Sequence, residues 1–215
     1  PGDVLRIYVF GDNTYQTEVK IDLNGNILLP DIGMFFASGY TFSSLKNRLN
    51  EFLGRSFSGL IDSPQRSFLD VSLTQLRPVK VTILGESNTP GPHLVGGFAT
   101  VLNALYSSGG IKTSGSLRNI QIFRNNKLRK TIDLYNYITK GSLDGDIRLM
   151  NNDIIFIPVR ENTVELNGTV RNASIYELKN GEGINEILNY SGGLNANSSS
   201  LAVINRIKPL SDRGI

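Results

Sequence analysis

The sequence has no cysteine, one histidine and no long apolar run, and each of these absences narrows the choice of function. Without cysteine there is no thiol catalysis, no cysteine-ligated zinc and no disulfide framework. No apolar run reaches the ~18 residues that a membrane-spanning helix needs. His93 lies in a Pro-Gly-Pro turn, and the sequence offers it no partners for a Ser/His/Asp arrangement or a metal site. We therefore expect no catalytic residue, no metal, no cofactor and no enzymatic activity.

Positive charge is also limited. The chain carries 22 Lys and Arg against 19 Asp and Glu, a formal net charge of +3. The basic residues look scattered and are not interleaved with aromatic residues, so the footprint of a nucleic-acid-binding protein is missing. With 40% hydrophobic and 19% charged residues, the composition is that of a globular protein.

What the sequence does have is an internal repeat. Residues 79–124 and 163–206 match at an offset of 83 positions, with a slip of one residue near the end. The offset aligns glycine and leucine positions: Gly85 with Gly168, Leu105 with Leu188, and Gly109-Gly110 with Gly192-Gly193. The repeat keeps glycines and apolar residues but no acid, base or nucleophile, which indicates binding and assembly.

Each copy has the same predicted plan of a β-branched strand, a turn, a second short strand, a helix that ends at Gly-Gly, and a return strand. The return strand is expected through Ile120 and Ile122 in copy one, and through Val203 and Ile207 in copy two. Copy one continues with a helix from Asp133 and a closing strand over residues 153–159, whereas copy two ends before an equivalent strand. A helix laid across a small mixed sheet is the β-grasp type of α+β fold.

The segment before the repeats has its own pattern. Residues 4–10 alternate as a half-buried strand does, and Asn24-Gly25 between two short strand patterns predicts a β-hairpin. Thr41 is expected to cap a helix. The apolar face predicted for that helix contains Phe42, Leu45, Leu49 and Phe52. A strand over residues 69–76 ends at Pro78. We therefore predict three domains, at residues 1–77, 78–160 and 161–215, the last one truncated.

These segments also resemble a known family. The motifs PGDVLRIYVFGD and VKIDLNGNILLPDIG, followed by a helix, are similar to the N-terminal domain of bacterial outer-membrane polysaccharide export proteins of the Wza type. The motifs VTILGESNTPGPHL, LNALYSSGGI and LMNNDIIFIPV resemble the soluble-ligand-binding β-grasp (SLBB) module of that family. Asn152 stands where the family usually has Gly, and Ala173-Ser174 replaces the Pro90-Gly91 of copy one; both changes fall in turns.

The resemblance implies a periplasmic, outer-membrane-associated part of an export channel for capsular or exopolysaccharide in a Gram-negative cell. It further implies a homo-oligomeric ring of the full-length protein and an inner-membrane partner, either a polysaccharide co-polymerase or a tyrosine autokinase. Since the chain begins without methionine and ends inside a strand pattern, we expect a fragment whose membrane anchor lies elsewhere. An alternative is a β-grasp array that captures a glycan or another small molecule without forming a channel. Nucleic-acid uptake is a third hypothesis, which the small net charge disfavours.

Four residues are candidate contacts to polysaccharide: Arg124, Arg206, Tyr106 and Tyr190. Each copy has one of the two arginines near the end of a strand. There a guanidinium can bind a sugar carboxylate through two parallel hydrogen bonds. The alternative for them is a salt bridge or a carbonyl cap inside each module. The two tyrosines can stack on sugar rings if exposed, or pack on the sheet if not. GEGINEIL, from Gly181, resembles a phosphate-binding loop but lacks its third glycine and preceding strand, so we interpret it as a helix entrance.

Overall fold

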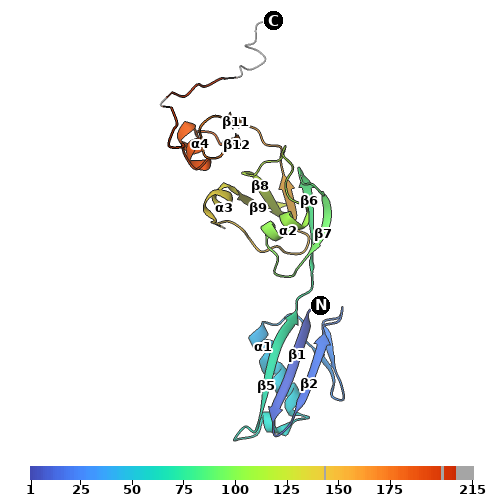
Figure 1. Ribbon diagram of the computed structural model, residues 1–215. Helices are drawn as coiled ribbons and strands as arrows, with labels where there is room; N and C mark the ends of the chain where they lie inside the picture. Colours follow the sequence, from blue (N-terminus) through green and yellow to red (C-terminus); the bar gives the residue numbers. More distant parts are fainter. Residues whose placement is uncertain (143, 200, 207–215) are drawn as a thin grey trace. The chain divides into compact units, whose positions relative to one another are not determined.

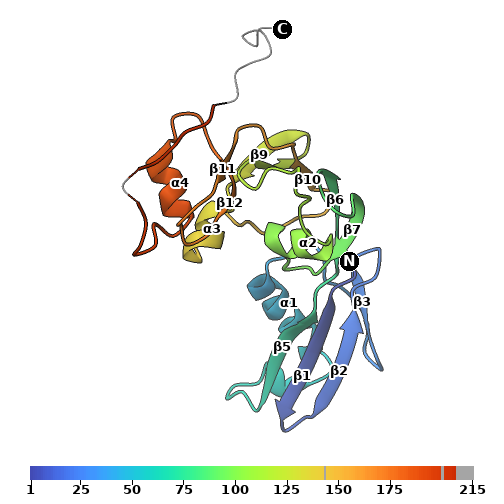
Figure 2. The same ribbon diagram turned by 45° about the horizontal axis from the view of Figure 1, so that its top comes forward.

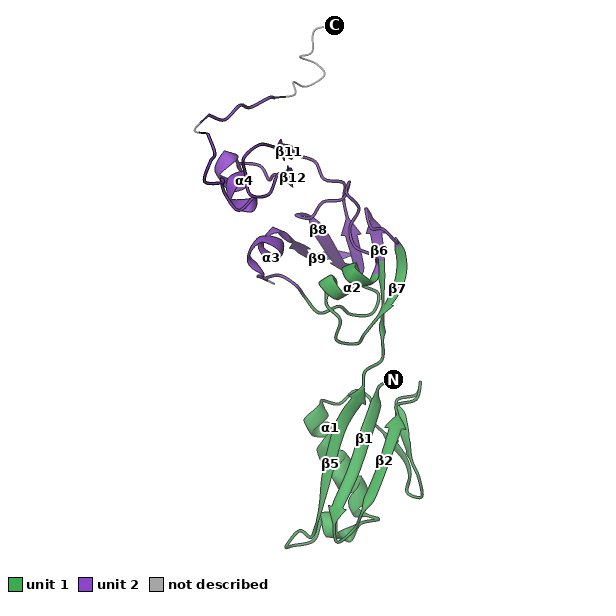
Figure 3. Ribbon diagram, in the orientation of Figure 1, with its two compact units in different colours: residues 1–82, 91–107, 147–153 green, residues 83–90, 108–146, 154–215 purple. Residues whose placement is uncertain are grey.

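The computed structural model describes residues 1–142, 144–199 and 201–206 of the chain. The chain falls into two compact units (Figure 3). The first contains residues 1–82, 91–107 and 147–153, and the second contains residues 83–90, 108–146 and 154–215. The boundary passes through strand β6 (Val79–Gly85), so both units use residues of the first repeat.

The N-terminal segment forms a three-stranded antiparallel sheet with the order β2-β1-β5 (Figure 1). Its strands are β1 (Val4–Gly11), β2 (Tyr15–Lys20) and β5 (Ser67–Gln75). Alternate residues of β1 are buried in the core: Leu5, Ile7 and Val9. The strand alternation predicted for residues 4–10 is therefore confirmed.

Helix α1 (Phe42–Gly54) covers the core side of this sheet (Figure 2), and the short 3-10 helix η1 (Ser58–Leu60) follows it. Thr41 caps α1 as predicted, because its hydroxyl oxygen accepts a hydrogen bond from the Ser44 N–H at 3.3 Å. The buried leucines of α1 are Leu45, Leu49 and Leu53. Phe42, predicted for the same face, is 46% exposed. Side chains tilt toward the start of a helix, so the first residue points past the end of the core.

The hairpin prediction at Asn24-Gly25 is wrong. A turn does form there: Gly25 has a φ of +88°, and the Asp22 carboxylate accepts a hydrogen bond from the Asn26 N–H at 2.8 Å. However, β3 (Asn26–Leu29) pairs with β4 (Gly33–Phe36), while β2 pairs with β1. A turn dipeptide fixes a local reversal of the chain but does not choose the strand's partner.

The first repeat contributes a five-stranded sheet with the order β7-β6-β10-β8-β9. The strands besides β6 are β7 (Gly91–Val95), β8 (Ile120–Arg124), β9 (Lys127–Ile132) and β10 (Ile154–Ile157). The Thr82 N–H donates to the Asp153 carbonyl, and the Glu86 N–H donates to the Ile157 carbonyl. Because both strands advance in the same direction, β6 and β10 are parallel, whereas β8 is antiparallel to β10 and β9. The sheet is mixed, as the β-grasp interpretation requires.

The helices of this repeat are α2 (Val101–Ser107) and α3 (Tyr135–Lys140). The Gly109-Gly110 pair that follows α2 has φ values of +72° and +88°, the left-handed conformation expected at a helix end. The closing strand predicted over residues 153–159 is present as β10. The α+β fold class is confirmed.

In the second repeat, β11 (Thr163–Leu166) and β12 (Ser174–Glu177) form a two-stranded antiparallel sheet, followed by α4 (Ile184–Tyr190). Residues 201–206 carry no strand assignment, and Ile207 of the expected return strand lies outside the described residues. Among the residues of α4, only Ile187 is buried.

The hydrogen bonds of the two repeats correspond at the offset of 83 residues. The Thr89 N–H donates to the Ser108 carbonyl at 3.1 Å, and the Asn172 N–H donates to the Ser191 carbonyl at 3.1 Å. Isolated bridges also correspond, pairing Ser87 with Ile111 and Val170 with Leu194. The aligned glycines all have positive φ: Gly85, Gly168, Gly109, Gly192, Gly110 and Gly193. The duplication inferred from sequence is therefore present in the backbone.

Candidate functional site

The four residues predicted to contact polysaccharide lie in different surroundings. Tyr106 in α2 is 67% exposed. Arg124 is half-buried at the end of β8, and Arg206 is exposed beyond the second repeat. Tyr190 is the last residue of α4 and belongs to the polar network described next. Nothing in these positions tests their contact with a sugar, which stays a prediction.

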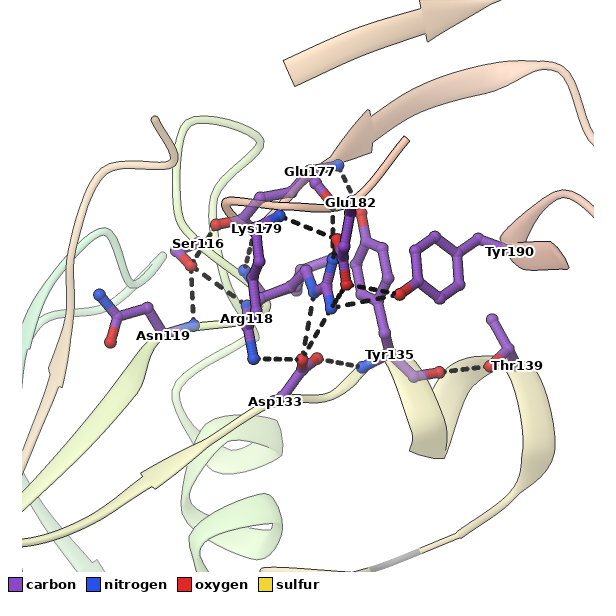
Figure 4. A network of polar contacts seen from close by, with 11 residues as sticks. Ser116, Arg118, Asn119, Asp133, Tyr135, Thr139, Glu177, Lys179, Glu182 and Tyr190 are labelled. Atoms are coloured by element: carbon purple, nitrogen blue, oxygen red, sulfur yellow. Dashed lines mark hydrogen bonds and ion pairs between the residues drawn. The ribbon is translucent and has the colours of Figure 1, made fainter. Parts of the chain in front are cut away.

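The centre of the network is Arg118, in the loop before β8, which is only 4% exposed (Figure 4). Its Nε and Nη2 atoms donate to Asp133 Oδ2, each at 3.1 Å. Nη2 also donates to Glu182 Oε1 at 2.8 Å, and Nη1 donates to Glu182 Oε2. A further bond runs from Nη1 to the backbone carbonyl of Glu177 at 3.1 Å. The two-point contact with Glu182 is the fork geometry that favours arginine over lysine.

Two tyrosines enclose the same guanidinium. The Arg118 Cζ atom lies 4.5 Å from the ring centre of Tyr135 and 5.1 Å from that of Tyr190. The rings meet edge to face, with centres 4.9 Å apart. The Tyr190 hydroxyl donates to Glu182 Oε1 at 2.9 Å, and the Tyr135 hydroxyl accepts from the Glu177 N–H at 2.6 Å. The aromatic faces therefore stabilise the buried cation where hydrogen bonds do not reach it.

A second set of bonds surrounds Arg118. The Ser116 hydroxyl donates to Glu177 Oε1 at 2.5 Å, and the Leu117 N–H donates to Glu177 Oε2 at 2.9 Å. Lys179 Nζ lies 2.7 Å from Asp133 Oδ2. Both carboxylate oxygens of the buried Glu177 are thus used, which a charge removed from water requires.

The charges of the network stabilise one another. Hydrogen bonds from Arg118 lower the pKa of Glu182 from its ordinary value to about 2, against a smaller opposing effect of burial. Burial acts to raise the pKa of Asp133, but bonds from Lys179 and Arg118 outweigh it and leave that pKa below its usual range. Burial acts to lower the pKa of Arg118, yet its carboxylate partners raise it. All three groups are ionised at neutral pH.

We call this network the Arg118 clamp, with the members Ser116, Arg118, Asp133, Tyr135, Glu177, Lys179, Glu182 and Tyr190. Residues 116–135 belong to the first repeat and residues 177–190 to the second, so the clamp joins the two repeats. Each nitrogen of the guanidinium bonds to an acceptor of the protein itself. The chemical role that this arrangement supports is a fixed junction, since no donor is left facing outward for a ligand.

A polar cleft of about 260 Å³ lies beside the clamp. It is lined mainly by amide, hydroxyl and charged side chains: Ser116, Arg118, Asn119, Thr131, Val159, Glu161, Asn162, Glu177, Leu178, Lys179 and Asn180. Amides and hydroxyls are the groups that exchange hydrogen bonds with sugar hydroxyls. The cleft offers such groups beside the junction of the two repeats.

Within the described residues, no cluster of three or more His, Asp or Glu could hold a metal ion. Among the described helices, none is long and apolar enough to cross a membrane. Asp22 closes the turn before β3, where its carboxylate accepts a hydrogen bond from the Asn26 N–H.

Sequence reasoning missed the clamp for a specific reason. It looked for polar residues that both copies keep, but the clamp takes Arg118 from one copy and Glu177 and Glu182 from the other. At the offset of 83, the equivalents of these two glutamates in copy one are Leu94 and Ala99. The only available signal was therefore a set of charged residues that the duplication does not explain.

Comparison with known proteins shows which families the segments of the chain match. Residues 1–67 match the family described as polysaccharide biosynthesis/export protein, and residues 79–157 and 163–212 each match the SLBB domain. Two sequences of the polysialic acid transport protein KpsD of Escherichia coli are 29% identical to the chain over 182 residues. The match covers 83% of this chain and 31% of each relative, so the chain spans about a third of their length.

The relatives are named for transport, and the matched family is named for polysaccharide biosynthesis or export. The matched family and these relatives are transport proteins and not enzymes. The chain therefore combines a segment that matches the polysaccharide biosynthesis/export family with two segments that each match the SLBB domain.

Proposed function

We propose that the chain is the periplasmic part of a polysaccharide export apparatus, a conduit that moves capsular polysaccharide or exopolysaccharide across the outer membrane of a Gram-negative cell. The observation that carries this proposal is the order of the three matched segments, an export segment and then two SLBB domains. The Arg118 clamp supports it, because two binding modules held at a fixed junction present one continuous surface to a polymer.

The proposal includes the partners that such a conduit needs. The full-length protein assembles into a ring of identical subunits and works with an inner-membrane polysaccharide co-polymerase or tyrosine autokinase. Light scattering on the full-length protein in detergent tests the ring, and a monomer there would contradict it. The domain boundaries at residues 77 and 160 and the contacts of Tyr106, Arg124, Tyr190 and Arg206 with the polymer belong to the same proposal.

The decisive experiment is deletion of the gene, followed by measurement of polysaccharide at the cell surface and in the periplasm. The expected result is loss of surface polymer, with recovery when the native gene is restored. Unchanged export in the deletion strain would overturn the proposal. A strain that carries the Arg118→Met variant, which lacks the clamp cation, is compared in the same way. Loss of surface polymer at a normal level of the variant protein indicates a failure of transport, whereas a reduced protein level indicates a structural defect.

A second candidate function is favoured by the polar cleft. An SLBB array of this kind captures a short glycan or other small molecule without forming a channel. Calorimetry with neutral and acidic oligosaccharides tests it, with Asn119→Ala and Asn180→Ala as variants of the cleft. Binding that these variants abolish, together with normal export in the deletion strain, would favour capture over conduction.

A further inference from the structure

Asparagine followed directly by glycine occurs at Asn24, Asn167 and Asn180. Such a pair can modify itself, because the backbone nitrogen of a glycine, which no Cβ shields, can attack the side-chain amide of the asparagine before it. In a folded chain the reaction depends on whether that nitrogen is free of hydrogen bonds and on how easily the backbone around it moves. The sites differ in both respects.

Asn180 and Gly181 are the central residues of a tight turn. The Glu182 N–H donates to the Lys179 carbonyl at 3.1 Å, and Gly181 has a φ of +89°. This is the pattern of a type II β-turn, whose own hydrogen bond does not use the N–H of its third residue. Within the residues that the structure describes, the Gly181 N–H has no acceptor, and outside its chain neighbours nothing lies within 4 Å of an added Cβ. The attacking nitrogen at this site is therefore free, and its surroundings are open.

The pair Asn24-Gly25 is the opposite case. Gly25 is buried, and its N–H donates to the Asp22 carbonyl at 3.1 Å. Its carbonyl accepts from the Ala37 N–H at 2.8 Å and from the Ser38 N–H at 3.0 Å. Attack by the Gly25 nitrogen requires the first bond to break, and rotation of the backbone there disturbs the other two. The fold therefore protects Asn24.

The third pair, Asn167-Gly168, lies between these cases. Outside the chain neighbours of Gly168, nothing lies within 4 Å of a Cβ added there. However, Asn167 Nδ2 donates to Glu165 Oε1 at 3.1 Å, which holds the side-chain amide toward β11. One exposed hydrogen bond restrains the amide only weakly. The expected order of reaction, from fastest to slowest, is Asn180, Asn167 and Asn24.

The reaction at Asn180 needs water and no other reactant. The Gly181 nitrogen attacks Cγ of Asn180, so that a new C–N bond forms and the Cγ–Nδ2 bond breaks. The side-chain nitrogen leaves as ammonia and takes the proton that Gly181 has lost. Water then opens the cyclic imide. Opening at Cγ gives aspartate, whereas opening at the backbone carbonyl carbon gives isoaspartate, whose main chain runs through Cβ and Cγ and is longer by a methylene.

This turn sets the spacing of two members of the Arg118 clamp. Residues 178–181 join Glu177, whose carbonyl accepts from Arg118 Nη1 at 3.1 Å, to Glu182, which binds the same guanidinium at two points. The Lys179 N–H also donates to Glu182 Oε2 at 2.8 Å. A longer main chain between the two glutamates displaces Glu182 from the guanidinium. A new carboxylate in the turn adds negative charge beside the network.

We propose that Asn180 is a site of spontaneous deamidation and that this modification weakens the Arg118 clamp as the protein ages. The junction between the two repeats is then strongest in newly made protein. Isoaspartate has the larger effect, because it changes the path of the backbone as well as the charge. Neither an enzyme nor a ligand is required, since both reacting groups belong to the same turn.

The first measurement is the rate of reaction at each asparagine. The chain is incubated at mildly alkaline pH in water labelled with heavy oxygen, and mass spectrometry of its peptides locates the labelled carboxylates. Asn180 should react at least about tenfold faster than Asn24, since the Gly25 nitrogen must first leave a buried hydrogen bond. In the chain unfolded by urea, the rates at the sites should become similar. Reaction of the folded chain at Asn24 or Asn167 as fast as at Asn180 would overturn the proposal.

The second measurement is hydrogen exchange of the backbone amides of residues 174–190 before and after the incubation. The native chain should lose protection in its modified fraction. Asn180→Gln should keep its protection, because glutamine would have to close a larger and less favourable ring. The matched control Asn167→Gln should lose as much as the native chain.

A further variant separates the two products. Asn180→Asp carries the new charge on an unaltered backbone, and it should lose less protection than the chain that contains isoaspartate. Chains modified at Asn180 that keep the protection of residues 174–190 would overturn the proposal. Loss of protection on incubation of Asn180→Gln, to the same extent as in the native chain, would also overturn it, because another change would then weaken the junction.

Discussion

The guanidinium of Arg118, which belongs to the first repeat, lies 5.1 Å from the ring centre of Tyr190, which belongs to the second. The tyrosine hydroxyl and the guanidinium share one acceptor, Glu182 Oε1. The contact thus combines a cation over a ring with a hydrogen bond to the same carboxylate. It ties the end of α4 to a loop more than sixty residues earlier in the chain.

Removing the clamp cation should release the second repeat. Arg118→Met leaves Asp133 and Glu182 without their buried partner, and we expect a loss of about 3 kcal/mol in the free energy that protects residues 174–190. Hydrogen exchange of their backbone amides measures it. The matched control is Arg6→Met at the Arg6–Glu18 pair, whose side chains are both 52% exposed. It should cost less than about 1 kcal/mol. Equal protection in native protein and Arg118→Met would show that the clamp does not hold the junction.

Acid should weaken the same junction. The pKa of Glu182 is about 2 in the folded chain against an ordinary 4.5, so the ionised form is stabilised by folding. This contribution is fully present above pH 4.5 and is lost as the pH falls from there toward 2. We expect a decrease on the order of 2 kcal/mol over this range.

The measurement is thermal unfolding at several pH values, for native protein and for Glu182→Gln. The variant has no carboxylate to titrate at this position, so the difference between the two proteins should be largest near neutral pH and shrink below pH 4.5. A constant difference down to pH 2.5 would contradict the role assigned to the Glu182 charge.

Two aligned glycines should respond differently to the same substitution. In Gly85→Ala the added Cβ would lie 2.0 Å from the Ile157 carbonyl oxygen of β10, and φ is +83°. At Gly168 φ is +100°, but nothing described lies within 4 Å of an added Cβ. We expect Gly85→Ala to cost about 3 kcal/mol or more and Gly168→Ala about 1 kcal/mol. Urea unfolding gives both values, and similar costs would mean that a strand also packs against Gly168.

The second repeat should be the least protected part of the chain. Its sheet has two strands, whereas the first repeat uses five, and few of its side chains are buried. Hydrogen exchange should therefore be faster over residues 163–206 than over residues 79–159. Protection of the β11 and β12 amides equal to that of β6 and β10 would show that the second repeat is as complete as the first.

Local signals predicted most of the fold, and the choice of strand partners and of side-chain contacts accounts for the differences. The alternation in β1, the Thr41 cap and the Gly-Gly helix ends were all found because each depends on neighbours in the chain. The partner of β3 was not predicted, because a turn sequence does not encode which strand pairs with the strand that follows it. The clamp depends on side chains that the fold brings together, and their spacing in the sequence carries no period.

The clamp also gives the tandem array a direction. The first repeat supplies the arginine and the second supplies the two glutamates. The side of a repeat that contacts the next one therefore differs chemically from the side that contacts the previous one. In copy two, the position equivalent to Arg118 is Leu201, or Ser200 if the slip is applied, and neither is basic. In copy one, Leu94 and Ala99 stand where Glu177 and Glu182 would receive such an arginine. A further SLBB module next to either repeat would therefore need a different set of contacts. The Arg118 clamp connects only this pair of repeats and cannot recur between other modules of a longer tandem array.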